Sequence, residues 1–196
     1  MTTLLSHHSL RQTLRARRRA LSPQDQQIAS QAIARHFMSL GLHLRYKHIG
    51  LYAAQDGEID PSFLAHMLTS MHRDCYLPML HPLGKNKIYF GHHHPGATTV
   101  KNRYGIDEPV GTRAILPQTL DLILMPLVGF DRDGNRLGMG GGYYDHSLSY
   151  LQARPKTQRL IGLAHHCQEI DALTTNPWDI PMSGVLTDKG YISAAR

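Results

Sequence analysis

The spacing of apolar residues predicts three helices in the first third of the chain. The first carries three leucines on one face, at Leu10, Leu14 and Leu21. A second helix is predicted after Ser22, which can cap its amino end while Pro23 occupies the first turn. Its expected apolar stripe consists of Ile28, Ala32, Ile33, Phe37 and Leu40. A third is predicted over residues 60–71, with Asp60 as its cap and Pro61 in its first position.

Apolar runs without strict alternation predict buried strands. The clearest covers residues 121–128 and is typical of the middle of a parallel sheet. Further strands are predicted at residues 48–53, 75–80, 87–90, 160–164 and 184–187. Residues 91–117 are rich in glycine and proline, so we expect loops there. Strands that alternate with helices favour a single α/β domain over residues 1–196, with helices on both sides of a mostly parallel sheet.

The composition is that of a globular protein and indicates a compartment. The 196 residues are 41% hydrophobic, which is enough for one well-packed domain. No apolar run is long enough to span a bilayer, and residues 1–8 lack the apolar stretch and cleavage site of a signal peptide. The two cysteines, Cys75 and Cys167, are expected to be free thiols. We therefore expect a cytoplasmic protein with no membrane partner.

The positive charge of the chain gathers in the first predicted helix. The formal net charge is +6, and the arginines of this helix are Arg11, Arg15, Arg17, Arg18 and Arg19. Nucleic acid is one partner for such a face, but aromatic side chains that stack on bases are missing from this stretch. We favour a small polyanion over nucleic acid. A solvated helix face is the alternative for most of these arginines.

A glycine-rich segment after the central strand is the most informative feature for function. It consists of Arg136, Leu137, Gly138, Met139, Gly140, Gly141, Gly142, Tyr143, Tyr144 and Asp145. A strand, a glycine loop and a helix over residues 144–153 suit a phosphate, because glycines adopt positive φ and let backbone N–H groups approach an anion. The segment lacks the Lys-Ser/Thr end of a Walker loop and the acidic residue of a dinucleotide site. We favour a nucleotide or phosphate site over a plain turn.

Four further features carry side chains suited to ligands. Asp145 directly follows the glycine loop, where it can hold a metal ion that accompanies phosphates. Glu58 follows the first strand, and a turn or a hydrogen bond to a ligand amine explains it equally well. Residues 104–109 suit a substrate-shaping loop or a plain turn. Asp179 stands beside the only tryptophan, and an aspartate in such a place is more often a turn residue than a metal ligand.

Fourteen histidines raise the question of a metal site. They include the runs 92–94 and 165–166, but neighbours on a strand point to opposite faces and do not easily converge on one ion. No zinc-binding spacing is present. We therefore expect these histidines to have no ligand role, and no order of Ser, His, Asp or Cys supports covalent catalysis.

The glycine segment resembles the signature of the 5-formyltetrahydrofolate cyclo-ligases, also called methenyltetrahydrofolate synthetases. The matching residues run through 125–131 and 134–145, and the resemblance extends over nearly the whole chain. Supporting segments are residues 9–11, 56–60, 76–78, 104–109 and 178–181. The resemblance implies a Rossmann-like three-layer α/β/α fold, with a topology related to that of sugar-phosphate isomerases.

The resemblance also implies a reaction. In this family, ATP and Mg²⁺ drive the ring closure of 5-formyltetrahydrofolate to 5,10-methenyltetrahydrofolate, with release of ADP and phosphate. The formyl oxygen is phosphorylated, N10 attacks the resulting iminium phosphate, and phosphate leaves. Catalysis of this kind consists mainly of positioning and charge stabilisation. A small folate is the implied partner, and we expect a monomer that does not bind nucleic acid.

The same resemblance assigns roles to residues of this chain. The catalytic residues would be Arg136, Tyr143 and Asp145. The ATP site would comprise Arg11, Arg136, Leu137, Gly138, Met139, Gly140, Gly141, Gly142, Tyr143 and Tyr144. The folate site would comprise Tyr52, Glu58, Met139, Gly140, Gly141, Gly142 and Tyr143. The ligands of Mg²⁺ would be Asp145 and Asp179.

Two departures and two alternatives accompany the resemblance. The loop before Glu58 is one residue longer than usual, which blurs the matching around Tyr52. His7 and His8 stand where the family usually has a lysine, and neutral histidine is a poorer phosphate partner, so we expect weaker ATP binding or a substitute cation. A sugar-phosphate isomerase of similar fold would need no ATP and would leave the glycine segment unexplained. A non-catalytic RNA-binding protein would use the arginine-rich helix.

Overall fold

The computed structural model describes residues 6–83, 86–153 and 158–195. Residues 1–5, part of the segment from which we expect no signal peptide, lie outside this description. Within it, eight strands form one sheet in the order β12-β11-β10-β7-β1-β2-β3-β6. The five central strands run parallel, and they are β11 (Gly184–Thr187), β10 (Arg159–Ala164), β7 (Leu122–Pro126), β1 (His48–Gly50) and β2 (Asp74–Leu80). The predicted α/β class with a mostly parallel sheet is confirmed.

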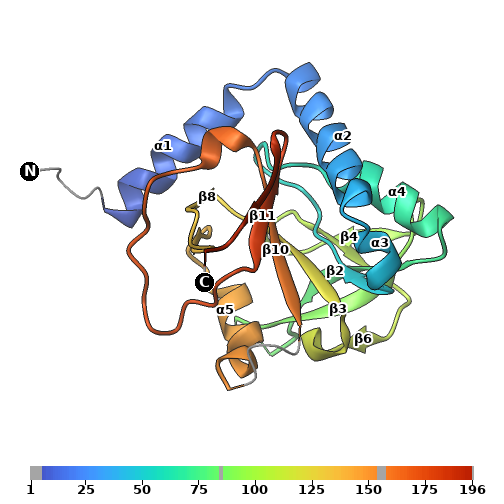
Figure 1. Ribbon diagram of the computed structural model, residues 1–196. Helices are drawn as coiled ribbons and strands as arrows, with labels where there is room; N and C mark the ends of the chain where they lie inside the picture. The colour runs from blue at the N-terminus through green and yellow to red at the C-terminus, as the bar shows by residue number, and fades with distance from the viewer. Residues whose placement is uncertain (1–5, 84–85, 154–157, 196) are drawn as a thin grey trace, which may run out of the picture.

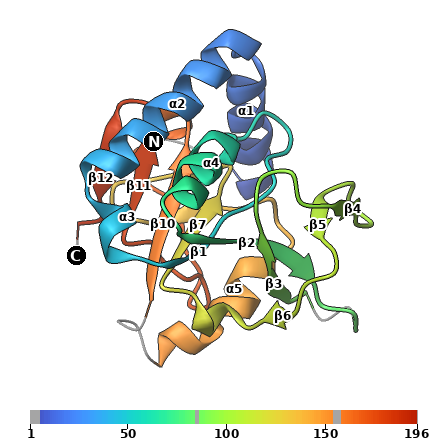
Figure 2. The same cartoon turned by 90° about the vertical axis from the view of Figure 1, so that its right-hand side faces the viewer.

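Helices cover both faces of the sheet (Figures 1 and 2). On one face lie α2 (Pro23–Ser39) and α4 (Ser62–Ser70), where Phe37 and Leu64 share a core with the central strands. On the other face lies α5 (Tyr143–Leu148), where Leu148 packs with residues of β3, β7 and β10. β7 is buried on both faces, as its unbroken apolar pattern predicts.

α1 (His7–Arg19) packs over the carboxyl end of the sheet rather than on a face. Its Leu14 is fully buried and contacts Val128 and Leu137, with Leu10 beside them. Leu21 lies beyond the end of the helix, so it is not part of this face. The position matters for function, because it brings the arginines of α1 to the edge where the ends of β1 and β7 meet.

The predicted Ser22 cap of α2 is confirmed, whereas the predicted Asp60 cap of α4 is wrong, because the N-cap of that helix is Pro61. The Ser22 hydroxyl accepts a hydrogen bond from the backbone N–H of Asp25 at 3.1 Å, and Pro23 stands in the first turn of α2. Asp60 accepts a bond from the N–H of Ser62 at 2.9 Å. Pro61 is the residue before α4 rather than its first residue, so this helix begins one position later than predicted.

The buried stripe of α2 differs from the predicted one. Ile28 and Leu40 are 53% and 46% exposed, whereas the buried residues are Ala29, Ser30, Ala32, Ile33, Ala34 and Phe37. The stripe is rotated because α2 contacts both α4 and the sheet, and small residues allow the close approach. Ser30 belongs to it because its hydroxyl accepts a bond from the N–H of Asp60 at 3.2 Å.

Short strands were the hardest elements to predict. β3 (Ile88–His93) is longer than expected, and the presumed loop region contains β4 (Thr99–Lys101), β5 (Asp107–Pro109), β6 (Ala114–Ile115) and η1 (Pro117–Thr119). The predicted last strand, β11, is followed by an antiparallel edge strand, β12 (Gly190–Ser193). The helix predicted over 144–153 is α5 followed by a 3₁₀ turn, η2 (Ser149–Gln152). A four-residue helix, α3 (Leu42–Arg45), follows Gly41.

Two further expectations concern the thiols and the membrane. Cys75 and Cys167 are free thiols, as predicted, and Cys75 is buried. Burial raises the pKa of the Cys75 thiol to about 11, so it is unreactive at neutral pH. None of the helices in the described residues is long and apolar enough to cross a bilayer.

Candidate active site

A cavity of about 880 Å³ opens where the carboxyl ends of β1, β2 and β7 meet. Segments far apart in sequence line it, including α1, the loop after β1, the glycine segment and the stretch before β11. Every residue that the sequence assigns to the site lines this one cavity: Arg11, Tyr52, Glu58, Arg136, Leu137, Gly138, Met139, Gly140, Gly141, Gly142, Tyr143, Tyr144, Asp145 and Asp179. The fold therefore brings these residues together, while their individual roles stay predictions.

The glycine segment leaves a small hairpin and enters α5. β8 (Gly129–Phe130) pairs with β9 (Arg136–Leu137), and the glycines follow. Gly140 and Gly142 have φ values of 102° and 66°, which other residues rarely adopt. Gly142 is the N-cap of α5, and no side chain caps the helix start. The backbone N–H groups of this turn are thus presented without a side chain in front of them.

The expectation of positive φ is wrong for Gly141. Its φ does not lie in the left-handed region. The reason for glycine here is space, since a β-carbon would come within 2.9 Å of the Tyr143 ring. Gly141 therefore permits the approach of Tyr143, while its two neighbours permit the turn.

Two carboxylates border the glycine segment. Asp145 forms an ion pair with Arg136, whose side chain is 6% exposed, and also accepts a bond from the N–H of Ile180 at 3.2 Å. Asp179 accepts a bond from the N–H of Asn176 at 2.7 Å and so closes a turn. No group of three His, Cys, Asp or Glu within the described residues could hold a metal by itself. Two carboxylates with phosphate oxygens and water are nevertheless the usual ligands of Mg²⁺, so the donor set fits that ion.

Glu58 is a buried carboxylate that lines the cavity from the loop after β1. Its Oε2 accepts a bond from the N–H of Gln55 at 3.1 Å, and its Oε1 lies 3.7 Å from Nη2 of Arg18. Burial raises the pKa of Glu58, an effect that the Arg18 charge opposes. Tyr52 is also buried and donates its hydroxyl to the carbonyl of Ile59 at 2.7 Å, so its ring rather than its hydroxyl is available to a ligand.

Four of the five arginines of α1 contact other segments of the chain, and only Arg18 is fully buried. Arg11 Nε donates to the carbonyl of Gly138 at 2.8 Å. Arg15, Arg18 and Arg19 all bind the carboxylate of Asp56, in the loop that carries Glu58. Burial alone would raise the pKa of Asp56, but hydrogen bonds from the three arginines lower it to about 2. The solvated helix face is therefore the wrong interpretation for Arg18, whereas Arg19 is paired with Asp56 but keeps a side chain that is 53% exposed.

The hairpin of β4 and β5 forms the outer wall of the cavity. Tyr104 at its tip makes a 2.8 Å hydrogen bond to the hydroxyl of Tyr143, which also accepts a bond from Arg103 at 2.9 Å. These two bonds, that from Tyr104 first, lower the pKa of Tyr143. Glu108 lines the same wall and accepts a bond from the N–H of Leu80 at 2.9 Å. The geometry favours a substrate-shaping loop over a plain turn.

Sequence reasoning missed the part that Arg18 plays. Arg17 and Arg18 are neighbours of the same type, yet the Arg18 side chain is fully buried while Arg17 is exposed. Its position four residues after Leu14, on the apolar face of α1, was the available signal. His165 was also not singled out, and its Nε2 lies 3.2 Å from the carbonyl of Gly57 in the same loop.

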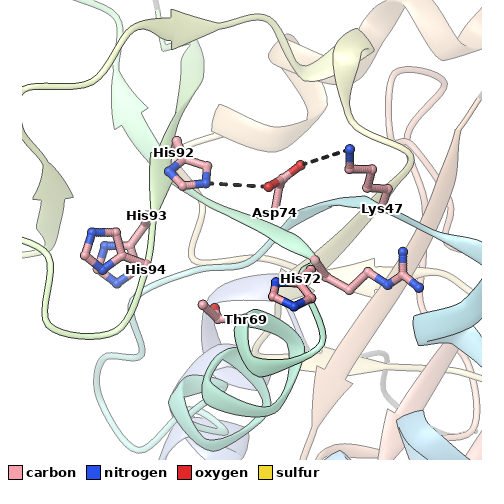
Figure 3. Close-up of a pocket in the computed structure, with 8 residues that line it drawn as sticks. Lys47, Thr69, His72, Asp74, His92, His93 and His94 are labelled. Carbon is pink, nitrogen blue, oxygen red and sulfur yellow. Dashed lines mark ion pairs between the residues drawn. The ribbon is translucent and has the colours of Figure 1, made fainter.

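A second hollow of about 390 Å³ gathers histidines at the far end of the sheet (Figure 3). His92, His93 and His94 line it together with His72, and the Asp74 carboxylate lies between His92 and Lys47. Asp74 begins β2, whereas the large cavity lies at the other end of that strand. Among the described side chains no three of these groups are arranged to hold a metal. The hollow is separate from the candidate active site.

Known proteins share both the sequence and the fold. The profile of the 5-formyltetrahydrofolate cyclo-ligase family matches residues 5–188. The chain is 40% identical over 176 residues to the 5-formyltetrahydrofolate cyclo-ligase of Escherichia coli, covering 89% of this chain and 96% of that protein. It is 37% identical over 179 residues to that of Haemophilus influenzae, covering 90% and 95%.

Two solved structures are similar to this fold. The 5,10-methenyltetrahydrofolate synthetase of Aquifex aeolicus matches with a TM-score of 0.82 at 27% identity, covering 98% of this chain and 94% of that one. That of Mycoplasma pneumoniae matches with a TM-score of 0.74 at 27% identity, covering 94% and 99%. The chain that places a glycine segment, two aspartates and a buried glutamate around one cavity therefore belongs to the 5-formyltetrahydrofolate cyclo-ligase family.

Proposed function

We propose that this protein closes the ring of 5-formyltetrahydrofolate to 5,10-methenyltetrahydrofolate, with conversion of ATP to ADP and phosphate. The observation that carries the proposal is the single cavity lined by both the glycine segment and Glu58. Membership of the cyclo-ligase family supports it independently. Both substrates must meet in one place for a phosphoryl group to pass between them, and this cavity offers a surface to each.

The glycine segment suits the phosphates of ATP. Gly140 and Gly142 keep the backbone N–H groups of the turn uncovered, and Arg11 and Arg136 contribute positive charge beside them. Positioned donors and fixed charges of this kind provide most of the catalysis in phosphoryl transfer. His7 also lines the cavity, in the region where the family has a lysine, which supports the expectation of weaker ATP binding.

Asp145 and Asp179 are the residues that would hold Mg²⁺. They supply two carboxylates at the border of the phosphate region. Bound there, the ion would neutralise charge on the transferred phosphoryl group. Because Arg136 shares Asp145, it would help to fix that carboxylate for the metal.

The side of the cavity that carries Glu58 and Tyr52 suits the folate. Glu58 is a hydrogen-bond acceptor placed for the amino and amide N–H groups of a pterin. Tyr52 and the exposed side chains of Met139 and Tyr104 offer apolar surface to the rings. With the formyl group held beside the phosphates, its oxygen takes the phosphoryl group, N10 attacks the formyl carbon, and the oxygen departs with phosphate as N10 loses its proton.

The test is a direct assay. Purified protein is mixed with 5-formyltetrahydrofolate and Mg-ATP, and the ultraviolet absorbance of the methenyl product is followed together with ADP release. We expect both products in equal amounts, and neither when folate or ATP is omitted. Chelation of the metal tests the Mg²⁺ requirement separately. ADP release that does not depend on folate, or no product at all, would contradict the proposal.

The same assay separates the alternatives. A sugar-phosphate isomerase would consume no ATP, and no feature of the cavity favours a sugar phosphate over a folate. An RNA-binding protein needs an exposed basic face, whereas Arg18 is buried and Arg15 and Arg19 are paired with Asp56. These contacts leave α1 with fewer free positive charges for RNA.

Three finer expectations belong to the proposal. The layered architecture supports the Rossmann-like topology related to sugar-phosphate isomerases that the family resemblance implies. We also propose a monomer of 22.0 kDa, which sedimentation would check. A cytoplasmic location stays a prediction from the sequence.

A further inference from the structure

Arg18 is a charged side chain with no exposure to solvent. Its guanidinium connects the loop after β1 to the end of β7: Nε donates to the carbonyl of Asp56 at 2.8 Å, and Nη1 donates to the carbonyl of Leu127 at 3.1 Å. Nη2 donates to the Asp56 carboxylate at 2.9 Å. A buried charge is costly unless it is paired and hydrogen-bonded, so this arrangement calls for an account beyond the packing of α1.

The same guanidinium faces Glu58 without consuming its acceptor capacity. Nη2 lies 3.7 Å from Oε1, which is too far for a hydrogen bond but close enough for a strong ion pair. Oε2 is held by the N–H of Gln55 at 3.1 Å. One oxygen is thus fixed by the backbone, while the other is stabilised as an anion and can still accept hydrogen bonds from a ligand in the cavity.

The surroundings of Glu58 make this support necessary. Burial raises its pKa, and the negative charge of Asp56 acts in the same direction, whereas Arg18, the Gln55 N–H and Arg15 lower it. The phenols that face it, those of the buried Tyr52 after β1 and the partly buried Tyr144 in α5, carry no compensating charge. Arg18 is the foremost of the groups that keep the carboxylate ionised. A protonated carboxyl would present a donor where a pterin needs an acceptor.

We infer that Arg18 is a positioning residue for the reaction, which holds Glu58 as an ionised, oriented acceptor for the pterin and does not itself touch substrate. The inference rests on the proposed function, because the pterin is the ligand that Glu58 would bind. Arg11 on the same helix donates to Gly138 in the glycine segment. α1 therefore contacts both the loop of Glu58 and the glycine segment, and fixes their relative position.

The test compares Arg18→Met with the wild type by steady-state kinetics and by calorimetric titration of each substrate. At a pH below the Glu58 pKa, we expect the KM for 5-formyltetrahydrofolate to rise by about tenfold for each unit by which that pKa rises, because the ionised fraction falls in this proportion. The KM for Mg-ATP should change little. Folate binding should weaken at low pH as Glu58 becomes protonated, and we call this part of the pH profile the acid limb. Because loss of the cation raises the Glu58 pKa, the acid limb should move to higher pH.

A double-variant cycle separates positioning from general loosening. In a Glu58→Gln background there is no carboxyl for Arg18 to keep ionised, so adding Arg18→Met should cause no further rise in the folate KM and no shift of the acid limb. A purely structural role predicts that the two effects add.

Two controls match the change. Gln168→Leu removes bonds of 2.8 Å and 3.0 Å to the carbonyls of Leu127 and Val128, and so loosens the same strand end without facing Glu58. It should lower the melting temperature but leave the acid limb in place. Arg17→Met removes an exposed charge from the same helix and should resemble the wild type.

If Arg18→Met does not fold, Arg18→Lys is the variant that tests the inference. Lysine keeps the charge but not the fork that binds Asp56 and Leu127, so the folate KM should rise while the acid limb stays nearer its wild-type position. An active wild type whose Arg18 variants keep the wild-type folate KM and acid limb would overturn the inference and leave the function standing. A wild type that neither binds folate nor turns over would instead refute the proposed function.

Discussion

At the scale of single residues, Asp145 has an observed partner, Arg136, and a proposed one, Mg²⁺. It balances the buried charge of Arg136, and it borders the cavity where a metal would accompany phosphate. Its bond from the N–H of Ile180 also connects α5 to the stretch before β11. A change at this position therefore affects both the charge of the site and the attachment of its walls.

We predict that Asp145→Asn folds but loses most of its activity. Asparagine keeps the shape and can still accept a bond from Arg136, but it removes one charge from the metal site. We expect the free energy of unfolding to fall by about 1–3 kcal/mol, since a buried cation loses its counter-charge. Activity over a magnesium titration and chemical denaturation provide the measurements. Asp133→Asn, at an exposed turn, is the control, and wild-type turnover in the Asp145 variant at all magnesium concentrations would refute the metal role.

Glu58→Gln should weaken folate binding more than ATP binding. A carboxylate only accepts hydrogen bonds, whereas the amide presents two donors on one side, so one pterin contact becomes mispaired at a cost of about 1–3 kcal/mol. Calorimetric titration of each ligand checks this, with Glu169→Gln at a surface ion pair as the control. Equal weakening of both ligands, or no weakening, would remove Glu58 from the pterin site.

At the scale of elements, the proposal that the glycine segment binds the phosphates of ATP, as a phosphate cradle, can be tested by substitution. We predict that Gly140→Val abolishes the thermal stabilisation by Mg-ATP while unfolding stays cooperative. Gly140 has a φ of 102°, which valine cannot readily adopt, and its β-carbon would project next to Arg11. Gly96→Val is the matched control, since Gly96 has a φ of 84° in open space away from the cavity. A rise in melting temperature with Mg-ATP equal to that of wild type would exclude the cradle.

The attachment of α1 should depend on pH through Asp56. Its pKa in the folded chain is about 2, below the usual 3.8, so its contribution of about 2 kcal/mol is complete above the usual value and is lost as the pH falls towards 2. Asp56→Asn should therefore be less stable than the wild type at neutral pH, with a difference that disappears in this acid window. Denaturation at a series of pH values measures it. A difference that stays constant down to pH 2 would show that the ionised carboxylate is not what holds α1.

At the scale of the whole molecule, both ligands should stabilise the fold, because each would bind surfaces that unfolding separates. At a hundredfold excess over its Kd, a ligand contributes about 2.7 kcal/mol, or about 5–10 °C in melting temperature for a chain of this size. We predict such shifts with 5-formyltetrahydrofolate and with Mg²⁺ plus a non-hydrolysable ATP analogue. Glu58→Gln should lose mainly the folate shift, and Gly140→Val mainly the nucleotide shift. Loss of both shifts in either variant would contradict the proposal that folate and nucleotide bind separate surfaces of one cavity.

Elements whose signals are local can be predicted from the sequence alone. The unbroken apolar run of β7, the Ser22 cap of α2 and the glycine segment with its aspartate are each specified by neighbouring residues, and each was predicted close to its place. The family signature added the assignment of site residues, all of which line one cavity. Local patterns suffice here because helix caps, strand burial and glycine turns depend on short-range sterics and hydrogen bonds.

The tertiary structure alone decided which of several similar side chains is buried and what it faces. Arg17 and Arg18 are equivalent in composition, yet only Arg18 enters the interior, because α1 crosses the ends of β1 and β7 at that point. Short edge strands such as β6 and β12 likewise depend on hydrogen bonds from distant partners rather than on their own residues. The tertiary fold therefore fixed the buried charge beside Glu58, since burial, pairing and the resulting shifts in pKa depend on contacts between segments far apart in the chain.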